Sequence, residues 1–177
     1  MEQPSFLARL TAILDRENIS PHVLTLEITE SVFLKEPAAT GLLFGKLRAL
    51  GFKIAFDDFG TGYSSLSYVE RYPVDTLKID RSFITGIESN KDSSEIVRTI
   101  IALGHTLGMK VIAEGIENGT QMILLKALGC DLGQGFLFSR PIEQQAAESL
   151  LQARREGETL APGQKKRCLA LACTQAA

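Results

Sequence analysis

The chain has 177 residues, of which 45% are hydrophobic and 23% charged, and its 19 basic and 21 acidic residues give a net charge of -2. This composition predicts one globular domain with a sizeable core, and it excludes a strongly basic class of protein that binds a nucleic acid polymer. No apolar run approaches the roughly 20 residues of a membrane span. The three cysteines, an odd number, predict neither a disulfide framework nor a zinc site, so a cytoplasmic location is expected.

Helical and extended patterns alternate along the chain. Apolar spacing, glycines and prolines predict helices at about 6–14, 37–50, 65–71, 94–107, 119–128 and 142–155, and strands at 22–28, 52–56, 76–79, 110–113 and 135–138. Five strands separated by helices predict an α/β fold of parallel βαβ units. Residues 1–155 are expected to form the domain. Residues 156–177 are expected to be a disordered tail, with a localisation or binding signal at Lys165-Lys166-Arg167 as the alternative.

Polar side chains collect where the predicted strands end. In a (β/α)8 barrel these strand ends meet at one mouth, where active sites lie. A carboxylate at such a position is costly to desolvate unless it is paired or binds a cation. Acids at four successive strand ends therefore suggest a shared cation site. The polar residues at or near the ends of the predicted strands are Glu27, Glu30, Asp57, Asp58, Lys78, Asp80, Glu114, Glu117 and Gln134.

Asp57 and Asp58 are the most informative pair. Adjacent carboxylates on a bending strand end can reach two neighbouring metals, and carboxylate oxygens suit hard cations such as Mg2+ or Mn2+. The alternative is that the Asp-Asp-Phe-Gly turn only caps the next helix. The following stretch, residues 60–65, is rich in glycine and hydroxyl groups and could be a phosphate cradle or a plain turn.

Three further side chains carry open alternatives. Lys78 and Asp80 share a strand face, so they could form a structural ion pair, or Lys78 could be a cation aimed at an anionic oxygen or a water. A Schiff-base lyase that uses Lys78 is another alternative. Glu114 ends an apolar strand before a glycine, which suits a metal ligand or a general base, with a helix cap as the alternative. Gln134, between two glycines, is weak evidence for a functional amide.

Five ordered motifs resemble those of the EAL-domain cyclic di-GMP phosphodiesterases. The resemblance covers about residues 5–151. The motifs are Leu26-Glu27-Ile28-Thr29-Glu30-Ser31, Asp57-Asp58-Phe59-Gly60-Thr61-Gly62-Tyr63-Ser64-Ser65, Leu77-Lys78-Ile79-Asp80-Arg81-Ser82-Phe83, Ala113-Glu114-Gly115-Ile116-Glu117 and Gly133-Gln134-Gly135-Phe136-Leu137-Phe138-Ser139-Arg140-Pro141.

The resemblance implies roles for these side chains. Glu27, Asp57 and Asp58 would ligate two divalent ions, Mg2+ or Mn2+, with Asp57 bridging them. Glu114 would be a ligand or the base, and Lys78 would orient the water or steady the phosphate charge. The remaining implied residues are Asp80, Glu117 and Gln134, which support the metal and water network, and Glu30, which anchors the loop that links the metal site to a dimer interface.

The reaction that the resemblance implies is two-metal hydrolysis of cyclic di-GMP to linear pGpG. The sequence contains no Glu-Ala-Leu triplet, and the family's phosphate-contacting Arg and metal-ligating Asn have no counterpart in it. An incomplete (β/α)8 barrel of the TIM type, with about five βα units, is therefore expected, because a complete barrel takes roughly 250 residues. We expect the chain alone to be weakly active or inactive. The alternative is a non-enzymatic remnant that binds cyclic di-GMP or a partner, with a homodimer also possible.

Overall fold

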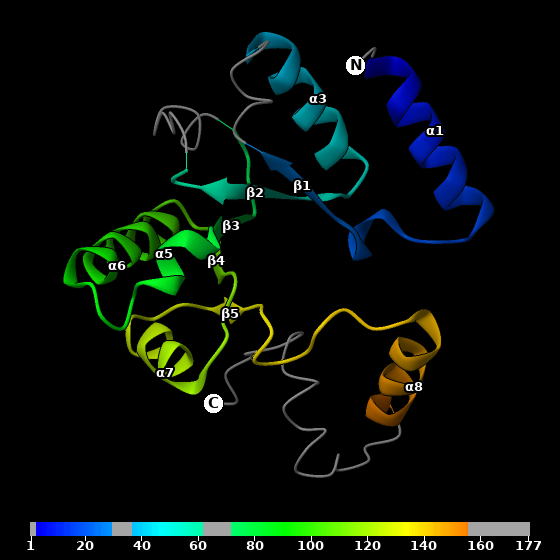
Figure 1. Ribbon diagram of the computed structural model, residues 1–177. Helices are drawn as coiled ribbons and strands as arrows, with labels where there is room; N and C mark the ends of the chain where they lie inside the picture. Colours follow the sequence, from blue (N-terminus) through cyan, green and yellow to red (C-terminus); the bar gives the residue numbers. More distant parts are fainter. Residues whose placement is uncertain (1–2, 30–36, 62–71, 156–177) are drawn as a thin grey trace. The chain divides into compact units, whose positions relative to one another are not determined.

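The computed structural model describes residues 3–29, 37–61 and 72–155, in which helices and strands alternate (Figure 1). The elements are α1 (Gln3–Arg16), η1 (Pro21–Val23), β1 (Thr25–Thr29), α3 (Pro37–Ala49), β2 (Lys53–Phe59), β3 (Thr76–Ile79), α5 (Arg81–Thr85), α6 (Lys91–Thr106), β4 (Lys110–Ala113), α7 (Gly119–Ala127), β5 (Leu132–Gly133) and α8 (Gln144–Arg155).

The strands lie in one sheet in the order β1-β2-β3-β4-β5, which is also their order in the chain. β1 runs parallel to β2, with Thr25 opposite Lys53, and β4 runs parallel to β5, with Ile112 opposite Leu132. Parallel neighbours need a crossover between them, and the helices supply it. The predicted α/β fold of parallel βα units is confirmed.

The chain divides into two compact units, and the first consists of Met1–Lys78 with Thr106–Met109. Its strand β2 has an apolar middle, Ile54–Phe56, in which Ile54 and Phe56 are buried. α3 packs against β2 and contributes the fully buried Phe44 and Leu47. Burial of these aromatic and branched side chains removes apolar area from water, the main driving force of folding.

The second unit consists of Ile79–His105 and Lys110–Ala177. Its core includes Val97 and Ile101 of α6, Val111 of β4 and Leu125 of α7. Gly104 lets α6 approach β4 closely, because a Cβ at this position would overlap the side chain of Val111. A larger residue there would push the helix away from the strand.

An aspartate precedes a strand in each unit and binds the neighbouring strand. Asp75, just before β3, accepts the backbone N–H of Ile54 at 2.9 Å. Asp131, just before β5, accepts the backbone N–H of Val111 at 2.8 Å. Each satisfies a donor at the start of a strand that would otherwise need water.

Each of these aspartates also pairs with a basic residue from the helix that precedes the neighbouring strand. Arg48 of α3 lies 3.4 Å from Asp75, and His105 Nε2 lies 2.9 Å from an oxygen of Asp131. The sequence analysis did not identify either arrangement. Both ends of the strands therefore use carboxylates, but at the beginnings they complete the backbone hydrogen bonding.

Most predicted elements are found, with shifted ends. The strands predicted at 76–79 and 110–113 have those bounds, while the strand predicted at 22–28 begins only at Thr25 because Pro21–Val23 form a 3-10 turn. The short helix α5 was not predicted. The helix predicted at 65–71 and the tail predicted at 156–177 lie outside the described residues.

The strand predicted at 135–138 is wrong. The fifth strand is Leu132–Gly133, and the predicted residues form a turn in which the Phe138 N–H donates to the Gly135 carbonyl at 3.1 Å. The alternation of the apolar side chains Phe136 and Phe138 suggested a strand. Gly133 and Gly135 pack closely against Ile116, since a Cβ at either glycine would overlap that residue. This packing favours the turn over a strand.

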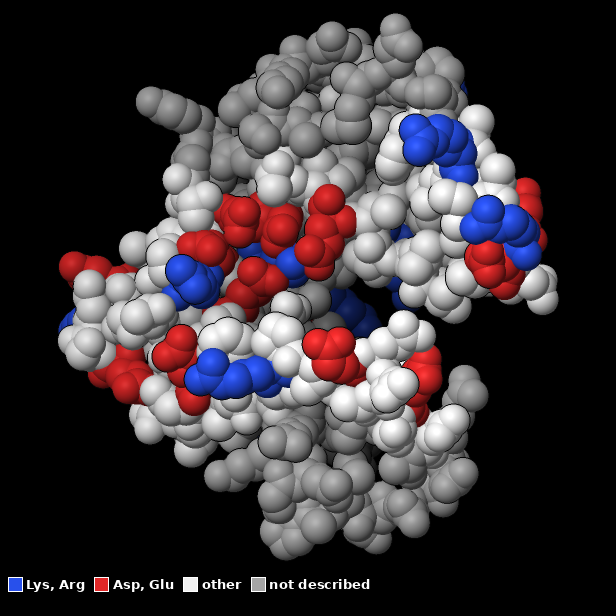
Figure 2. Space-filling view, turned by 45° about the vertical axis from the view of Figure 1, so that its right-hand side comes forward, with Lys and Arg blue, Asp and Glu red and all other residues white. Residues whose placement is uncertain are grey.

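Charge is mixed over the described surface. Acidic side chains gather in one area of the face drawn in Figure 2, and the basic side chains are scattered over the rest of it. None of the described helices has the length and hydropathy needed to cross a membrane.

Candidate functional site

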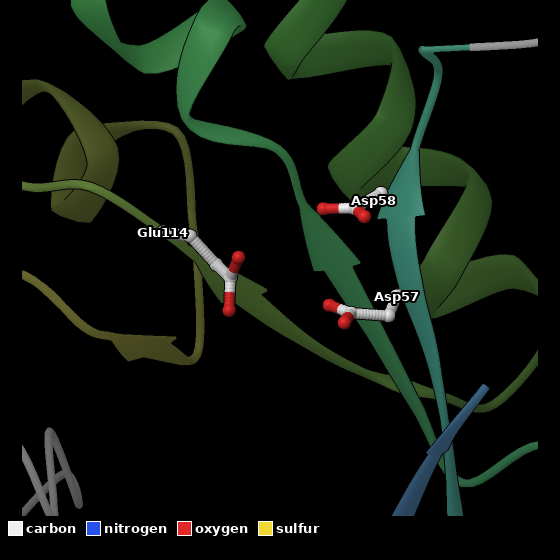
Figure 3. A group of neighbouring side chains, drawn as sticks. All are labelled: Asp57, Asp58 and Glu114. Carbon is white, nitrogen blue, oxygen red and sulfur yellow. The ribbon is translucent and has the colours of Figure 1, made fainter. Parts of the chain in front are cut away.

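Asp57 and Asp58 lie at the end of β2 with their carboxylates on the same side of the strand (Figure 3). In a regular strand, neighbouring side chains point to opposite faces. Here Asp58 has a φ of 55°, a left-handed conformation that breaks the alternation. A carboxylate oxygen of Asp57 and one of Asp58 consequently lie within 4.8 Å of each other.

The conformation of Asp58 is uncommon for a residue other than glycine, and Asp and Asn are the types that adopt it with least strain. The turn that follows supports it, because the Thr61 hydroxyl donates to the Asp58 carbonyl at 2.9 Å. Strained backbone of this kind is concentrated at active sites and ligand-binding loops. The turn thus holds two adjacent carboxylates in an arrangement that an ordinary strand does not give.

Lys78 of β3 joins Asp57 to Glu27 of β1. Its ammonium nitrogen lies 2.8 Å from an oxygen of Glu27 and 2.8 Å from Oδ1 of Asp57. The side chain of Lys78 is only 5% exposed, whereas those of Asp57 and Glu27 are 20% and 50% exposed. A buried ammonium is tolerated when it is paired in this way. The predicted convergence of Glu27, Asp57 and Lys78 is therefore observed.

Two consequences follow for Lys78. Its positive charge is held against two carboxylates and not displayed on the surface, so it can steady negative charge at this edge of the sheet. A Schiff-base lysine must also reach its substrate, whereas the Lys78 side chain is only 5% exposed and is paired with two carboxylates. The lyase alternative therefore gains no support from the surroundings of Lys78.

Asp80 follows β3 and caps α5. Its carboxylate accepts the Ser82 backbone N–H at 3.0 Å, as is common for Asp at the N-terminus of a helix. Burial by itself raises the pKa of Asp80, but hydrogen bonds from Ser82 and Arg81 and the charge of Arg81 outweigh it and lower the pKa below its ordinary value. Asp80 is therefore held as a carboxylate, and its observed contact is with the helix that begins beside it.

Glu114 and Gln134 belong to the second unit. Glu114 follows β4 directly (Figure 3), is half-buried, and donates its backbone N–H to the carbonyl of Ile79 at 3.1 Å. Gln134 follows β5; its backbone N–H donates to Ala113 at 2.9 Å and its carbonyl accepts from Ile116 at 3.0 Å. The loops that carry these two side chains are thus hydrogen-bonded to each other.

Glu117 is exposed, and its backbone is held by a buried glutamine that the sequence analysis missed. Gln121 of α7 is 5% exposed and accepts the backbone N–H of Glu117 at 2.8 Å. It forms a capping box with Asn118, whose side chain accepts the Gln121 N–H at 3.0 Å. The Asn-x-x-Gln spacing is the sequence signal that could have identified it.

The remaining predicted residue, Glu30, lies outside the described residues, as does most of the loop at 60–65. The site that the described residues form in the first unit comprises three strand ends, with Glu27, Asp57, Asp58 and Lys78. Three carboxylates and one ammonium leave an excess of negative charge there. Such an excess suits an oxygen-ligated cation.

The chain is similar to known proteins over most of its length. The chain is 44% identical over 142 residues to a cyclic di-GMP phosphodiesterase of Pseudomonas aeruginosa, NbdA, a match that covers 80% of this chain and 18% of NbdA. The PaMucR phosphodiesterase in its c-di-GMP complex matches with a TM-score of 0.76 and 42% identity, over 80% of this chain and 57% of that one. Klebsiella pneumoniae BlrP1, in a manganese/cy-diGMP complex, matches with a TM-score of 0.73 and 33% identity, over 78% and 35% of the two chains.

The chain thus spans about a fifth of the length of the curated relatives that it matches. Its five parallel strands and their helices correspond to part of the TIM barrel of the EAL-domain structures. The family described as the EAL domain matches residues 1–141, most of the sequence. We conclude that this chain belongs to the EAL domain family.

Proposed function

We propose that this chain supplies metal-binding and phosphate-facing residues of a cyclic di-GMP phosphodiesterase. The observation that carries the proposal is the pair Asp57 and Asp58, held on one side of β2 by the left-handed backbone of Asp58. Support also comes from relatives, since NbdA is named a cyclic di-GMP phosphodiesterase and BlrP1 was solved with manganese and the dinucleotide.

The donor set fits a hard divalent cation. In the first unit, Asp57 and Asp58 have carboxylate oxygens within 4.8 Å of each other, and Glu27 and Glu114 are the further acids that the resemblance implies. All are carboxylates, as Mg2+ and Mn2+ prefer. When bound, the ions would polarise the phosphodiester and make water a stronger nucleophile near neutral pH.

The protein's own residues would position the reactants. Lys78 is proposed to hold Asp57 in place through its 2.8 Å ion pair and to bring positive charge close to the phosphate. Glu114 is proposed as a further ligand or the general base. Asp80 and Glu117 are proposed to support the water network, the first from the N-terminus of α5 and the second from the loop that Gln121 fixes. Gln134, on the adjoining loop, is proposed to support the same network.

Turnover and binding test the proposal together. The chain and its Asp58→Ala variant would be incubated with cyclic di-GMP and Mn2+, pGpG would be quantified, and dinucleotide affinity would be measured by calorimetry. Asp15→Ala is the matched control, because Asp15 is an exposed aspartate of α1. Metal-dependent binding that Asp58→Ala weakens supports the proposal, and equal binding of Mn2+ and dinucleotide by Asp58→Ala and Asp15→Ala would contradict it.

The same experiment distinguishes an enzyme from a binding protein. The second candidate is a non-enzymatic domain that binds the dinucleotide. Binding without pGpG formation would support that candidate and the expectation that this chain alone is inactive. Formation of pGpG that Asp58→Ala abolishes would show that the chain is an enzyme as it stands.

A further inference from the structure

Asn118 is the asparagine of this chain that a glycine follows. The other two, Asn18 and Asn90, precede isoleucine and lysine. Asparagine loses its side-chain amide when the backbone nitrogen of the next residue attacks the side-chain carbonyl carbon. A following glycine makes this attack easiest, because it has no Cβ to obstruct the ring that forms and its backbone rotates freely. Asn118-Gly119 is therefore the pair in this sequence that is most prone to deamidation.

The surroundings of this pair leave room for the reaction. Asn118 and Gly119 are both exposed, and a Cβ placed on Gly119 would meet nothing within 4 Å. The Gly119 N–H belongs to the first turn of α7, whose leading N–H groups have no acceptor within the helix. Water can therefore reach both the attacking nitrogen and the amide.

The conformation of Asn118 opposes the reaction. The five-membered ring closes only if the Gly119 nitrogen turns toward the Asn118 side chain, whereas Asn118 is extended, with a φ of -141° and a ψ of 167°. The Asn118 side chain accepts the Gln121 backbone N–H at 3.0 Å. The Gln121 side chain accepts the backbone N–H groups of Glu117 at 2.8 Å and of Asn118 at 3.3 Å. These bonds hold the amide and the backbone away from the reactive geometry.

We propose that Asn118 is a site of spontaneous deamidation whose rate is set by opening of the capping box that Asn118 and Gln121 form. The Gly119 nitrogen bonds to Cγ of Asn118, the Cγ–Nδ2 bond breaks, and ammonia leaves with the proton that the Gly119 nitrogen gives up. Water then opens the succinimide ring, at the Cγ–N bond to give aspartate or at the backbone C–N bond to give isoaspartate. The reaction needs neither metal nor dinucleotide, so it does not depend on the proposed function.

The two products differ in their effect on α7. Aspartate caps a helix as well as asparagine does, and its charge is favourable beside a helix N-terminus. Isoaspartate continues the backbone through the former side-chain carbon, so residue 118 can no longer accept the Gln121 N–H in the same geometry. We therefore expect isoaspartate, and not aspartate, to loosen the loop that carries Glu117.

Peptide mapping of the full chain after incubation at mildly alkaline pH tests the site. The unchanged chain, Gln121→Ala and Gln121→Glu would be incubated in the folded state, and the unchanged chain also in urea. Chromatography with mass spectrometry would quantify aspartate and isoaspartate at residue 118, and thermal unfolding would show that each variant folds.

The chain offers two controls. Asn90 is the matched asparagine, because it is exposed and its side chain caps α6 by accepting the Asp92 N–H at 2.8 Å, but lysine follows it. Gly119→Ala is the matched variant, because the added Cβ meets nothing in the folded chain and obstructs only the ring closure.

Deamidation at residue 118 should be fastest in urea and slowest in the folded, unchanged chain, because local opening limits it there. Gln121→Ala should raise the folded rate roughly 2- to 30-fold, the factor that corresponds to the usual contribution of a cap. Gln121→Glu keeps the acceptor and should keep the slow rate. Gly119→Ala should slow the reaction in both conditions.

Three outcomes would overturn the inference. Deamidation in urea that is no faster at Asn118 than at Asn90 would show that the pair is not a reactive site. Equal rates in urea and in the folded chain would show that the fold does not restrain the reaction. A folded Gln121→Ala chain that reacts no faster than the unchanged chain would remove the capping box as the control, and if this variant does not fold, a fast reaction in folded Gln121→Glu would do the same.

Discussion

Carboxylates stand at both ends of the strands, with opposite consequences. At the strand beginnings, Asp75 and Asp131 each accept a backbone N–H of the neighbouring strand. Each also pairs with a basic side chain of the helix that precedes that neighbouring strand. At the end of β2, Asp57 pairs with the buried Lys78, and Asp58 is turned toward the same side by a left-handed backbone. The same side chain type therefore serves stability at one end and proposed chemistry at the other.

The comparison separates carboxylates that complete the hydrogen bonding of the sheet from those proposed to bind a cation. At the strand beginnings, one oxygen of each aspartate accepts a backbone hydrogen bond that is required for the sheet, so the group is committed to the native structure. At the end of β2, backbone geometry brings a carboxylate oxygen of Asp57 and one of Asp58 within 4.8 Å of each other, and the Lys78 ammonium lies 2.8 Å from Asp57. Substitutions at the two ends should therefore separate cation binding from stability.

The largest expected effect is at the strand end. Asp57→Asn should lower the affinity for Mn2+ by about 100-fold or more, since removal even of groups that only support metal ligands costs 10- to 100-fold. Electron paramagnetic resonance titration of free Mn2+ would measure it, with Asp15→Asn as the control. An Asp57→Asn chain that binds Mn2+ as the control does would remove the distinction between the two ends.

The strand beginnings should show the reverse pattern. Asp131→Ala should lower the free energy of unfolding by about 1–3 kcal/mol, because the Val111 N–H loses its acceptor. Asp131→Asn should lower it less, since an amide oxygen can still accept. Urea denaturation would measure both, and neither should change the affinity for Mn2+. A loss of Mn2+ affinity in a folded Asp131→Asn chain would contradict the comparison.

A smaller effect is expected at Asp80, which follows β3 directly and caps α5. Asp80→Ala should reduce the free energy of unfolding by about 1 kcal/mol at pH 7, the typical value of a cap. Because the folded pKa of Asp80 is lowered, the unfolded chain binds more protons in this range and stability rises with pH. The contribution is complete above the unfolded pKa of about 4 and is lost as the pH falls through the folded pKa.

Unfolding curves from pH 7 down to pH 3 would therefore converge for the unchanged chain and Asp80→Ala. A difference that persists undiminished at the lowest pH would show that the cap does not depend on the charge. Asp80→Asn is the control for shape, because asparagine is an equally good capping residue.

The smallest effects concern the helix partners of the two strand-beginning aspartates. The Arg48–Asp75 and His105–Asp131 pairs are partly exposed, so Arg48→Gln and His105→Gln should each change the free energy of unfolding by at most about 1 kcal/mol. Urea denaturation of each variant beside the unchanged chain would measure the change, and a loss in either variant larger than that of Asp131→Ala would contradict the expectation.

The sequence alone determined the alternation of strands and helices, the family motifs, and the acids that follow the strands. Apolar runs bounded by glycine are a local property, and for that reason the strands at 76–79 and 110–113 were predicted with correct bounds. The convergence of Glu27, Asp57 and Lys78 also followed from local information, because parallel strands bring their carboxyl ends to one edge.

Only the tertiary structure decided the features that depend on distant partners. The alternation of apolar side chains in residues 135–138 favoured a strand. Packing of Gly133 and Gly135 against Ile116 favours a turn instead, in which Phe136 is exposed. The same-side placement of Asp57 and Asp58 depends on one backbone angle that no spacing rule predicts. In both cases the deciding energy comes from contacts or strain at positions that periodicity does not describe.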